Sequence, residues 1–542
     1  MTTAAAATPE PKENKMPSAI WFIVSNELAE RFCFYGINSI LTLYMVQYLH
    51  FGDADATSSQ ALFKVGAYFF PMMGAIISDA LWGKYRTIMV FSTVYMVGCI
   101  LLAFIGTTPW TMGLSLGLVA VGTGGIKPCV STNVGDQFSA KNQHLIERAF
   151  SWFYMAINLG SSFSIFLCPV LLDNPNWGPK WAFGLPAVMM AAATLTFWSG
   201  RRRYVKVPPA GKAWLKEVFS TEGLKLAANL VVIYFFVACF WMLWDQSNGS
   251  TWTLQATSGL MNKNIGFGLT LLPAHVQLVN GIFILMLAPL FSYAVYPFLG
   301  RFFKVTPLRK IGLGLWVVAS SFLIIAWIED RIQAGHEVSV YWQIAAYLVL
   351  TAAEILVSIT ALEFSYKQAP LRMKSFIMGL FLLSTAAGNV AISAVNKAMQ
   401  KPLHVRAIEG GAETWVTVDE VKDFVTGQKI DLAGDIGLTV AQGADGKPGP
   451  LEGTFLAGEI DANGRMRLMD VKNRAPVVTS GTPSLEKAKV STYYLVGPIY
   501  FLFFAGVMAA MAIVYIFVAL AYKERTHVRE DAPAAAPEPA GA

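Results

Sequence analysis

Three ionisable side chains lie close together in an otherwise apolar stretch near the start of the chain. Glu30 and Arg31 follow Glu27 by three and four residues, which places all three on one face of a helix together with Tyr35. A charge at the centre of a bilayer costs about 2.5–3.5 kcal/mol on insertion scales, so such groups pair, face water or take part in function. The pattern predicts an ionisable helix face directed at the protein interior. A salt-bridged cluster that only fastens two helices is the alternative.

Two further polar positions interrupt apolar stretches. Lys127 follows the glycine-rich run 122–125, whose small residues allow a neighbouring helix to approach closely. Lys127 is a candidate partner for Glu27 or Glu30, and a lysine that extends to the membrane interface is the alternative. Asn158 is either an interhelical hydrogen-bonding residue or a ligand for substrate amides.

Composition indicates a helical membrane protein with many spans. The chain has 542 residues, of which 55% are hydrophobic and 14% charged, and its mean hydropathy is +0.48. A soluble protein would carry nearer about 25% charged residues. The net charge of +6 is small and lies largely in short loops, which argues against a nucleic-acid partner. The five cysteines all fall in apolar segments without metal-ligand spacing, so neither a disulfide framework nor a metal cofactor is expected.

Twelve membrane-spanning helices are expected from the hydropathy pattern. Lysine and arginine gather in alternate loops, which places both termini in the cytoplasm by the positive-inside rule. The expected spans are residues 18–49, 60–82, 87–106, 110–132, 149–172, 181–199, 224–246, 276–299, 309–328, 341–364, 375–396 and 492–522.

This pattern predicts two six-helix bundles with additional soluble segments. The amino-terminal bundle covers 18–199, and the carboxy-terminal bundle covers 224–396 and 492–522. A polar segment at 401–489, with short alternating apolar runs, predicts a small β-rich extracytoplasmic insert between helices 11 and 12. The remaining expected segments are a cytoplasmic tail at 1–17, a cytoplasmic linker at 200–223 and a disordered cytoplasmic tail at 523–542.

The turn after the second expected span carries small and charged residues. Gly74, Asp79, Gly83 and Arg86 suit a tight cytoplasmic turn with a helix-capping acid. This turn resembles the loop motif of the major facilitator superfamily, in which two six-helix bundles rock about a central site. We interpret it as a gating loop that does not touch the substrate.

Three separated motifs together resemble the proton-dependent oligopeptide transporter family. They are Glu27-x-x-Glu30-Arg31-Phe32, the stretch from Gly122 to Phe138, and Phe153-Tyr154-x-x-Ile157-Asn158-x-Gly160. They occur in the family's order and on the corresponding spans, and the resemblance covers all twelve expected helices. Only the insert lies outside it.

The resemblance implies roles for individual residues. Proton coupling would involve Glu27, Glu30, Arg31 and Asp245, with Lys127 as a switching partner, and Asp245 would also belong to the outer gate. Glu354 would meet the amino terminus of a bound peptide, and Arg31 and Lys127 its carboxylate. The other residues implied to line the peptide site are Tyr35, Tyr68, Asn158, Trp241, Asn280 and Phe381.

The chain departs from the family pattern at three of the positions compared. Ala61 stands where animal relatives have a histidine, so proton coupling would have to rest on carboxylates. Asn38 stands where many members have an arginine, and Phe381 where many have a tryptophan. The six histidines fall at span ends or in loops, where solvated positions are expected.

These features predict a proton-coupled symporter of di- and tripeptides in the inner membrane, acting as a monomer, with the proton as coupling ion and without another cofactor. A family member that carries another solute, such as nitrate or a peptide-like metabolite, is the alternative. A membrane-embedded enzyme is disfavoured because no nucleophile–base pair or metal-ligand set is evident. A receptor is disfavoured because no sizeable cytoplasmic domain is expected.

Overall fold

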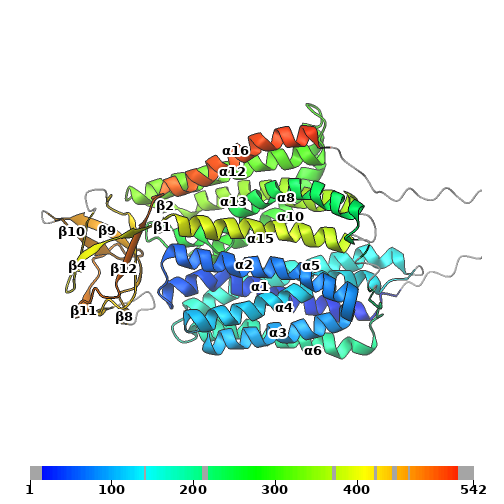
Figure 1. Ribbon diagram of the computed structural model, residues 1–542, viewed down its shortest axis with the longest axis horizontal. Coiled ribbons are helices and arrows are strands. Elements are labelled where there is room, and N and C mark those ends of the chain that lie inside the picture. The colour runs from blue at the N-terminus through cyan, green and yellow to red at the C-terminus, as the bar shows by residue number, and fades with distance from the viewer. Residues whose placement is uncertain are drawn as a thin grey trace, which may run out of the picture.

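A computed structural model shows a long helical bundle with a β-rich domain at one end (Figure 1). It describes residues 15–139, 142–209, 211, 216, 218–368, 374–419, 424–441, 448–461 and 464–522. Most of the expected amino-terminal tail and all of the expected tail at 523–542 lie outside these residues. We call the end of the bundle that carries the β-rich domain the insert end.

The amino-terminal half contains six long helices. Their boundaries lie within five residues of the predicted spans, except that the second helix begins seven residues earlier. The helices are α1 (Ala19–Gln47), α2 (Asp53–Ile76) continued by the π-helical segment η1 (Ile77–Trp82), α3 (Lys84–Ile105), α4 (Pro109–Asp136), α5 (Ile146–Asp173) and α6 (Gly178–Ser199).

The carboxy-terminal half repeats this arrangement with more interruptions. Two of its spans contain π-helical segments, one of which begins directly after Glu354. The elements are α8 (Thr221–Ser247), α9 (Thr251–Gln255), η4 (Pro273–Gln277), α10 (Leu278–Leu290), η5 (Phe291–Val295), α11 (Tyr296–Leu299), α12 (Pro307–Gln333), α13 (Val340–Glu354), η6 (Ile355–Ile359), α14 (Thr360–Gln368), α15 (Lys374–Ala398) and α16 (Pro498–Ala521).

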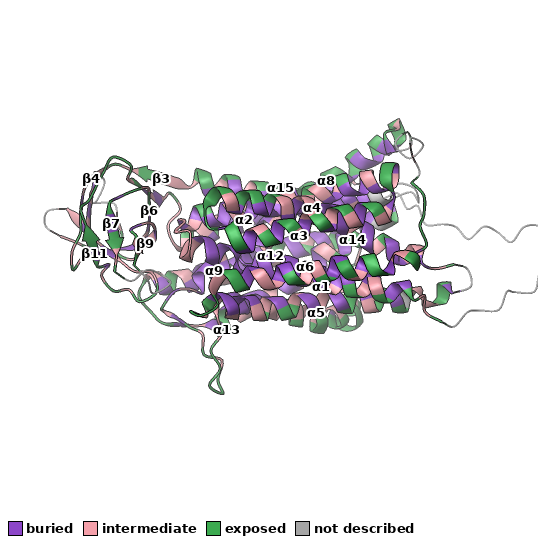
Figure 2. Cartoon of the chain, turned by 90° about the horizontal axis from the view of Figure 1, so that it is seen from below, coloured by how far each residue is buried: buried purple, intermediate pink, exposed green. Residues whose placement is uncertain are grey.

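The outer surface of the bundle is apolar. Large side chains such as Phe104, Leu195, Phe517 and Leu520 are more than 60% exposed, and exposed residues cover the outward helix faces (Figure 2). Exposed apolar area on this scale fits lipid rather than water. In the described residues, eleven helical segments are long and apolar enough to cross a membrane, and α1, which carries the charged cluster, is a twelfth helix of sufficient length. The chain is a multi-pass membrane protein, as predicted.

The insert is a β-domain between α15 and α16, as predicted. Strands β3, β12, β6, β9, β10, β5 and β4 form a seven-stranded sheet in that order, and β11, β7 and β8 form a second sheet. A separate parallel pair joins β1 (Met261–Asn262) to β2 (Val338–Ser339) within the carboxy-terminal half. The insert strands are β3 (Gln400–Leu403), β4 (Val405–Glu409), β5 (Trp415–Val418), β6 (Lys429–Ala433), β7 (Leu438–Val440), β8 (Gly449–Pro450), β9 (Gly453–Ile460), β10 (Arg465–Met469), β11 (Thr479–Gly481) and β12 (Lys489–Tyr493).

The last predicted span was too long at its start. Residues 492–493 belong to β12, and α16 begins at Pro498. The hydroxyl of Thr492 donates to the Lys429 carbonyl within the insert, so this polar segment is held by the sheet. Hydropathy alone could not separate the strand from the helix because the two are only four residues apart.

Glycines of α4 let its neighbours pack backbone to backbone. A Cβ atom at Gly124 would lie 2.2 Å from the Cβ of Phe70 on α2, and one at Gly74 would lie 2.4 Å from the carbonyl oxygen of Gly124. Small residues at membrane helix contacts permit this close approach. The glycine run therefore allows a neighbouring helix to approach closely, as predicted, and this contact holds α4 against α2.

We expect Gly124→Ala to destabilise the protein, because the added methyl group must displace Phe70 or its backbone. Overpacking of this kind costs about 1–3 kcal/mol, which thermal unfolding of the purified protein in detergent would register as a lower Tm. Gly117→Ala is the matched control, since a Cβ at Gly117 on the same helix meets no atom within 4 Å. Equal Tm values for the two variants would contradict the packing argument.

Candidate functional site

The charged cluster of α1 forms as the sequence predicts. Arg31 Nε lies 2.7 Å from Glu27 Oε1 and 3.1 Å from Glu30 Oε2, and the hydroxyl of Thr123 on α4 donates to Glu30 Oε1 over 3.0 Å. Both glutamates are buried. One guanidinium therefore balances two carboxylates within a single helix turn, and α4 supplies a neutral donor.

Lys127 does not form the predicted ion pair with Glu27 or Glu30 in this structure. Its ammonium lies 3.7 Å from the ring centre of Phe34 and 4.3 Å from that of Tyr68. The Nζ atom of Lys127 is buried and has no hydrogen-bond partner within the described residues. Because Nζ is buried, Lys127 does not extend to the membrane interface, which was the alternative prediction. Arg31 already occupies the carboxylates, and two aromatic faces hold the second cation instead.

Glu354 is a partly buried acid of the carboxy-terminal half. Its Oε2 accepts hydrogen bonds of 2.9 Å from Trp244 Nε1 on α8 and from Asn280 Nδ2 on α10. Asn280 also donates to Thr351 one turn earlier on α13, over 3.0 Å. The prediction brought Asn280 and Glu354 to one site, and the structure places them in contact.

The tryptophan that contacts Glu354 is Trp244, which is not among the site residues that the resemblance implied. Trp244 is the donor, whereas Trp241 packs against it with ring centres 5.3 Å apart, and its buried Nε1 has no hydrogen-bond partner in the described structure. Phe381 is buried, with its ring 6.0 Å from that of Tyr234 on α8. Phe381 therefore contributes to core packing between α15 and α8.

A second buried ion pair joins the two halves, and sequence reasoning missed one of its partners. Lys64 Nζ on α2 lies 2.9 Å from Asp245 Oδ1 on α8, and both side chains are 2% exposed. Asn389 Nδ2 on α15 donates to the other carboxylate oxygen over 2.6 Å. The signal was available, because Lys64 is a lysine inside an apolar span.

Neutral hydrogen bonds continue this contact toward the insert end. Gln60 Nε2 of α2 donates to the carbonyl oxygens of Asn248 and Gly249, and Asn38 Nδ2 donates to the side chain of Asn248. Asn38, which replaces an arginine in the family pattern, therefore serves the contact between the halves. We call this set of contacts between α2 and the carboxy-terminal half the seam.

His275 also joins the two halves, which corrects the expectation that it is solvated. Its side chain is buried, its Nε2 lies 2.9 Å from the carbonyl oxygen of Phe166 on α5, and the two rings stack with centres 5.2 Å apart. A position at the start of a span is buried here because another helix covers it.

The remaining predicted positions lie apart from these clusters or serve the helices themselves. Asn158 donates to the carbonyl oxygen of Tyr154 on its own helix, over 2.8 Å. Tyr35 packs edge to face on Phe34, beside Lys127. Gly83 takes φ +75° in the turn between η1, which carries Asp79, and α3, which carries the exposed Arg86. In that turn Lys84 pairs with Asp136 of α4 over 2.5 Å.

Comparison with known proteins links this arrangement to one family. The sequence profile of the POT family matches residues 85–221 and 212–416, more than half of the chain. Solute carrier family 15 member 2 of Danio rerio is 36% identical over 359 residues, which are 58% of this chain and 50% of the fish protein. Peptide transporter family 1 of Drosophila melanogaster is 36% identical over 362 residues, which are 58% of this chain and 48% of the fly protein. The chain spans about half the length of these curated relatives.

A solved structure shares the whole architecture. The crystal structure of the POT family transporter PepTSo is 28% identical to the chain, with a TM-score of 0.69, and the match covers 94% of this chain and 99% of that one. The two-bundle fold is therefore that of a known group of transporters.

We expect Lys64→Gln to cost about 3–5 kcal/mol of stability, because it leaves Asp245 buried without a counter-ion. Lys64→Gln/Asp245→Asn should recover much of that loss, and thermal unfolding of all four proteins gives the coupling energy. Lys84→Gln is the control, because its pair with Asp136 is partly exposed and should matter less. Additive losses in the double variant would show that the two side chains do not interact.

Proposed function

The chain belongs to the POT family, and from this premise we propose that it is a proton-coupled symporter of di- and tripeptides that works by alternating access. The name of the fly relative supports peptides as the cargo, and so does the name of a solved structure of a proton dependent oligopeptide (POT) family transporter. We propose that it resides in the inner membrane as a monomer with both termini in the cytoplasm, which places the insert outside. The family is one of transporters, and no catalytic role, cofactor or nucleic-acid partner is part of the proposal.

The observation that carries the proposal is the separation of charge between the halves. A zwitterionic peptide presents an ammonium group at one end and a carboxylate at the other. Glu354 on α13 keeps Oε1 free of the hydrogen bonds that hold Oε2, and it can receive the ammonium group. Lys127 on α4, whose ammonium has only aromatic neighbours in the described structure, can receive the carboxylate. Charge-assisted bonds of this kind are strongest away from water.

The remaining residues of the implied site can adjust to the peptide between these ends. Tyr35 and Tyr68 lie beside Lys127 through the shared neighbour Phe34, and Trp241 offers an unpartnered indole N–H beside the Glu354 cluster. We propose that Asn158 exchanges its bond within α5 for a bond to a peptide amide. Arg31 reaches the peptide carboxylate only by loosening its hold on Glu27 or Glu30.

We propose that proton coupling rests on the same competition. Arg31 holds two carboxylates at 2.7 and 3.1 Å, and protonation of either glutamate removes one of its counter-charges. The guanidinium, relieved of one of its two counter-charges, can then turn to the carboxylate of the peptide. Asp245 would take part because movement of the halves breaks its pair with Lys64. The gating loop with Gly74, Asp79, Gly83 and Arg86 would act at the opposite, cytoplasmic end.

We expect Glu354→Gln to weaken uptake of a dipeptide with a free amino terminus by about 10- to 100-fold, because the ammonium group loses a charged acceptor. Uptake into proteoliposomes under an imposed proton gradient measures this, with a tripeptide and nitrate tested in parallel. Glu363→Gln is the matched control, because Glu363 is exposed and pairs with Lys367 on the same span. Unchanged dipeptide uptake by Glu354→Gln, together with nitrate uptake by the unmodified protein, would refute peptide transport.

We expect Glu30→Gln to abolish gradient-driven uptake while peptide counterflow continues, because exchange of peptide across the membrane needs no net proton movement. Both assays use the same proteoliposomes, and Glu363→Gln again serves as the control. Loss of counterflow as well would assign Glu30 to binding or folding and would contradict its coupling role.

A further inference from the structure

The insert completes the first turn of α2, which belongs to the opposite half. Gly52 precedes the helix and offers no side chain to cap it. The hydroxyl of Thr454 accepts the N–H of Asp53 over 2.8 Å, and the hydroxyl of Tyr493 accepts the N–H of Ala54 over 3.4 Å. The first N–H groups of a helix have no partners within it. Two strands of the insert therefore cap α2 from outside.

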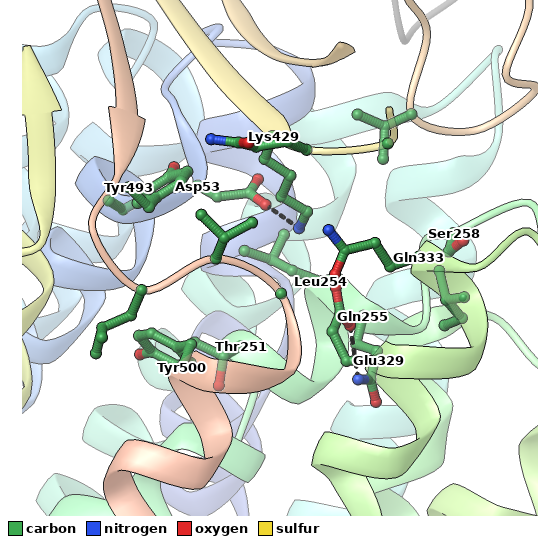
Figure 3. Close-up of a pocket in the computed structure, with 18 of the residues that line it drawn as sticks. Asp53, Thr251, Leu254, Gln255, Ser258, Glu329, Gln333, Lys429, Tyr493 and Tyr500 are labelled. Atoms are coloured by element: carbon green, nitrogen blue, oxygen red, sulfur yellow. Dashed lines mark hydrogen bonds and ion pairs between the residues drawn. The ribbon is translucent and has the colours of Figure 1, made fainter. Parts of the chain in front are cut away.

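A partly buried charged cluster reinforces this cap (Figure 3). Lys429 Nζ of β6 lies 2.6 Å from Asp53 Oδ2. Asp431, two residues along the same strand, is buried and accepts hydrogen bonds from the hydroxyls of Thr454 and Tyr493. A Cβ atom at Gly52 would lie only 2.5 Å from the Asp431 carboxyl group, so the chain before α2 also presses on this cluster.

The body of the insert belongs to the carboxy-terminal half. Its first strand begins two residues after α15, and α16 begins five residues after its last strand. Arg474 Nη1 also donates to the carbonyl oxygen of Ile332 at the end of α12, over 3.2 Å. The insert therefore moves with this half, and its hold on α2 crosses between the halves.

A cavity lies beside the contact between the insert and α2. Its empty volume is about 1080 Å³, and it is partly open to solvent. Asp53, Lys429 and Tyr493 line it where the insert meets α2, and Gln255 and Glu329 line it from the carboxy-terminal helices (Figure 3). The pair of Lys429 with Asp53 therefore borders an open space rather than a packed core.

The helix that the insert holds is the one that forms the seam. Below Asp53, Thr57 accepts a hydrogen bond from Asn396 of α15 over 2.9 Å, and Ser58 donates to the carbonyl oxygen of Ser393. Gln60 and Lys64 follow one and two turns deeper. The insert contact is thus the outermost contact in a continuous line along α2.

We propose that the insert is a latch on the outer gate, in which Lys429 and Asp431 hold the start of α2 and set how readily the two halves separate at the insert end. Both are positioning residues, because they act through Asp53 and the cap and do not touch the cargo. The proposal rests on the proposed function only in requiring that the halves move.

The latch contains a titratable group on the outer side of the membrane. Burial, and then the negative charge of Asp53, raise the pKa of Asp431 from its ordinary 3.8 to about 7, although Lys429 and the hydroxyls of Thr454 and Tyr493 oppose this. The closed contact therefore binds a proton that an opened contact releases. Such a group favours the closed contact most below its ordinary pKa of 3.8, and this contribution declines as the pH rises and is lost by about pH 7. The latch should be weaker at neutral and alkaline pH than in an acidic medium.

The latch predicts that Lys429→Gln and Asp53→Asn each favour separation of the insert ends of the two halves. Spin labels on Trp110→Cys and Glu337→Cys, both exposed at that end of opposite halves, report their separation in lipid nanodiscs by double electron–electron resonance. We expect the fraction of long distances to rise at least about threefold. The exchanged pair Asp53→Lys/Lys429→Asp should restore the original distribution.

Arg406→Gln is the matched control, because its pair with Asp419 lies on the exposed surface of the insert. Distances in Lys429→Gln and Asp53→Asn that equal those of this control would overturn the latch. Asp53→Asn leaves the insert sequence intact, so a damaged insert fold would not explain its effect. The experiment measures a distance and does not depend on peptide uptake. It can therefore contradict the latch while uptake persists, and it can support the latch while uptake is absent.

The same labels test the pH response between pH 5.5 and 8.5. The long-distance fraction of the unmodified protein should rise from pH 5.5 to about pH 7 and level off above it. Asp431→Asn, which stays neutral, should show no such step. A pH response of equal size in Asp431→Asn would show that Asp431 is not the group that makes the latch sensitive to pH.

Discussion

A charge inside a bilayer needs a partner, and this constraint decides where the helices of this protein meet. Lys64 and Asp245 belong to opposite halves and are 2% exposed, so the closed arrangement of the halves is the one that pairs them. Arg31 meets the same requirement within α1 by holding Glu27 and Glu30. In the part of the chain that the structure describes, the ammonium of Lys127 has no hydrogen-bond partner and lies over the rings of Phe34 and Tyr68, whose attraction of about 0.5–2 kcal/mol is weaker than that of a buried ion pair. Of these cations, it gains most from an arriving carboxylate.

One face of α2 carries several of the contacts that join the halves. Asp53, Thr57, Gln60, Lys64 and Tyr68 are spaced four, three, four and four residues apart, which is a single stripe along a helix. At about 1.5 Å per residue the stripe spans about 22 Å. It therefore runs from the insert, through the seam, to the ring that holds Lys127. Movement of this one helix would change the outer contacts and the cation site together.

The sequence was sufficient for the parts of the structure that depend on local pattern. Hydropathy located the spans, charge spacing located the Glu27–Glu30–Arg31 cluster, and alternation predicted that the insert is rich in β-strands. The partners of Lys64, Lys127 and Glu354 were not predictable in this way. Lys64 and Asp245 are 181 residues apart, and no periodicity relates them. Trp241 and Trp244 differ by one helix turn, and only the rotation of α8 against α13 selects Trp244.

The α2 stripe itself was present in the sequence as a polar line through an apolar span, with the same spacing argument that identified the α1 cluster. The stripe was not predicted because its charge is sparse: Thr57 and Gln60 are neutral and give a weaker signal than ionisable residues. Their importance comes from acceptors on the other half, such as the carbonyl oxygens of Asn248 and Gly249, which exist only in the folded chain.

The two charged clusters respond to different events because of how they are connected. When the halves separate, Lys64 and Asp245 lose each other but gain water, and the return of hydration offsets much of the lost attraction. That pair therefore specifies the closed geometry without making it irreversible. Glu27, Glu30 and Arg31 lie on one helix, so rigid movement of the halves leaves their distances unchanged. Only a proton, or a competing charge such as Lys127 or a peptide terminus, can rearrange them, and this distinction separates the gate from the coupling site.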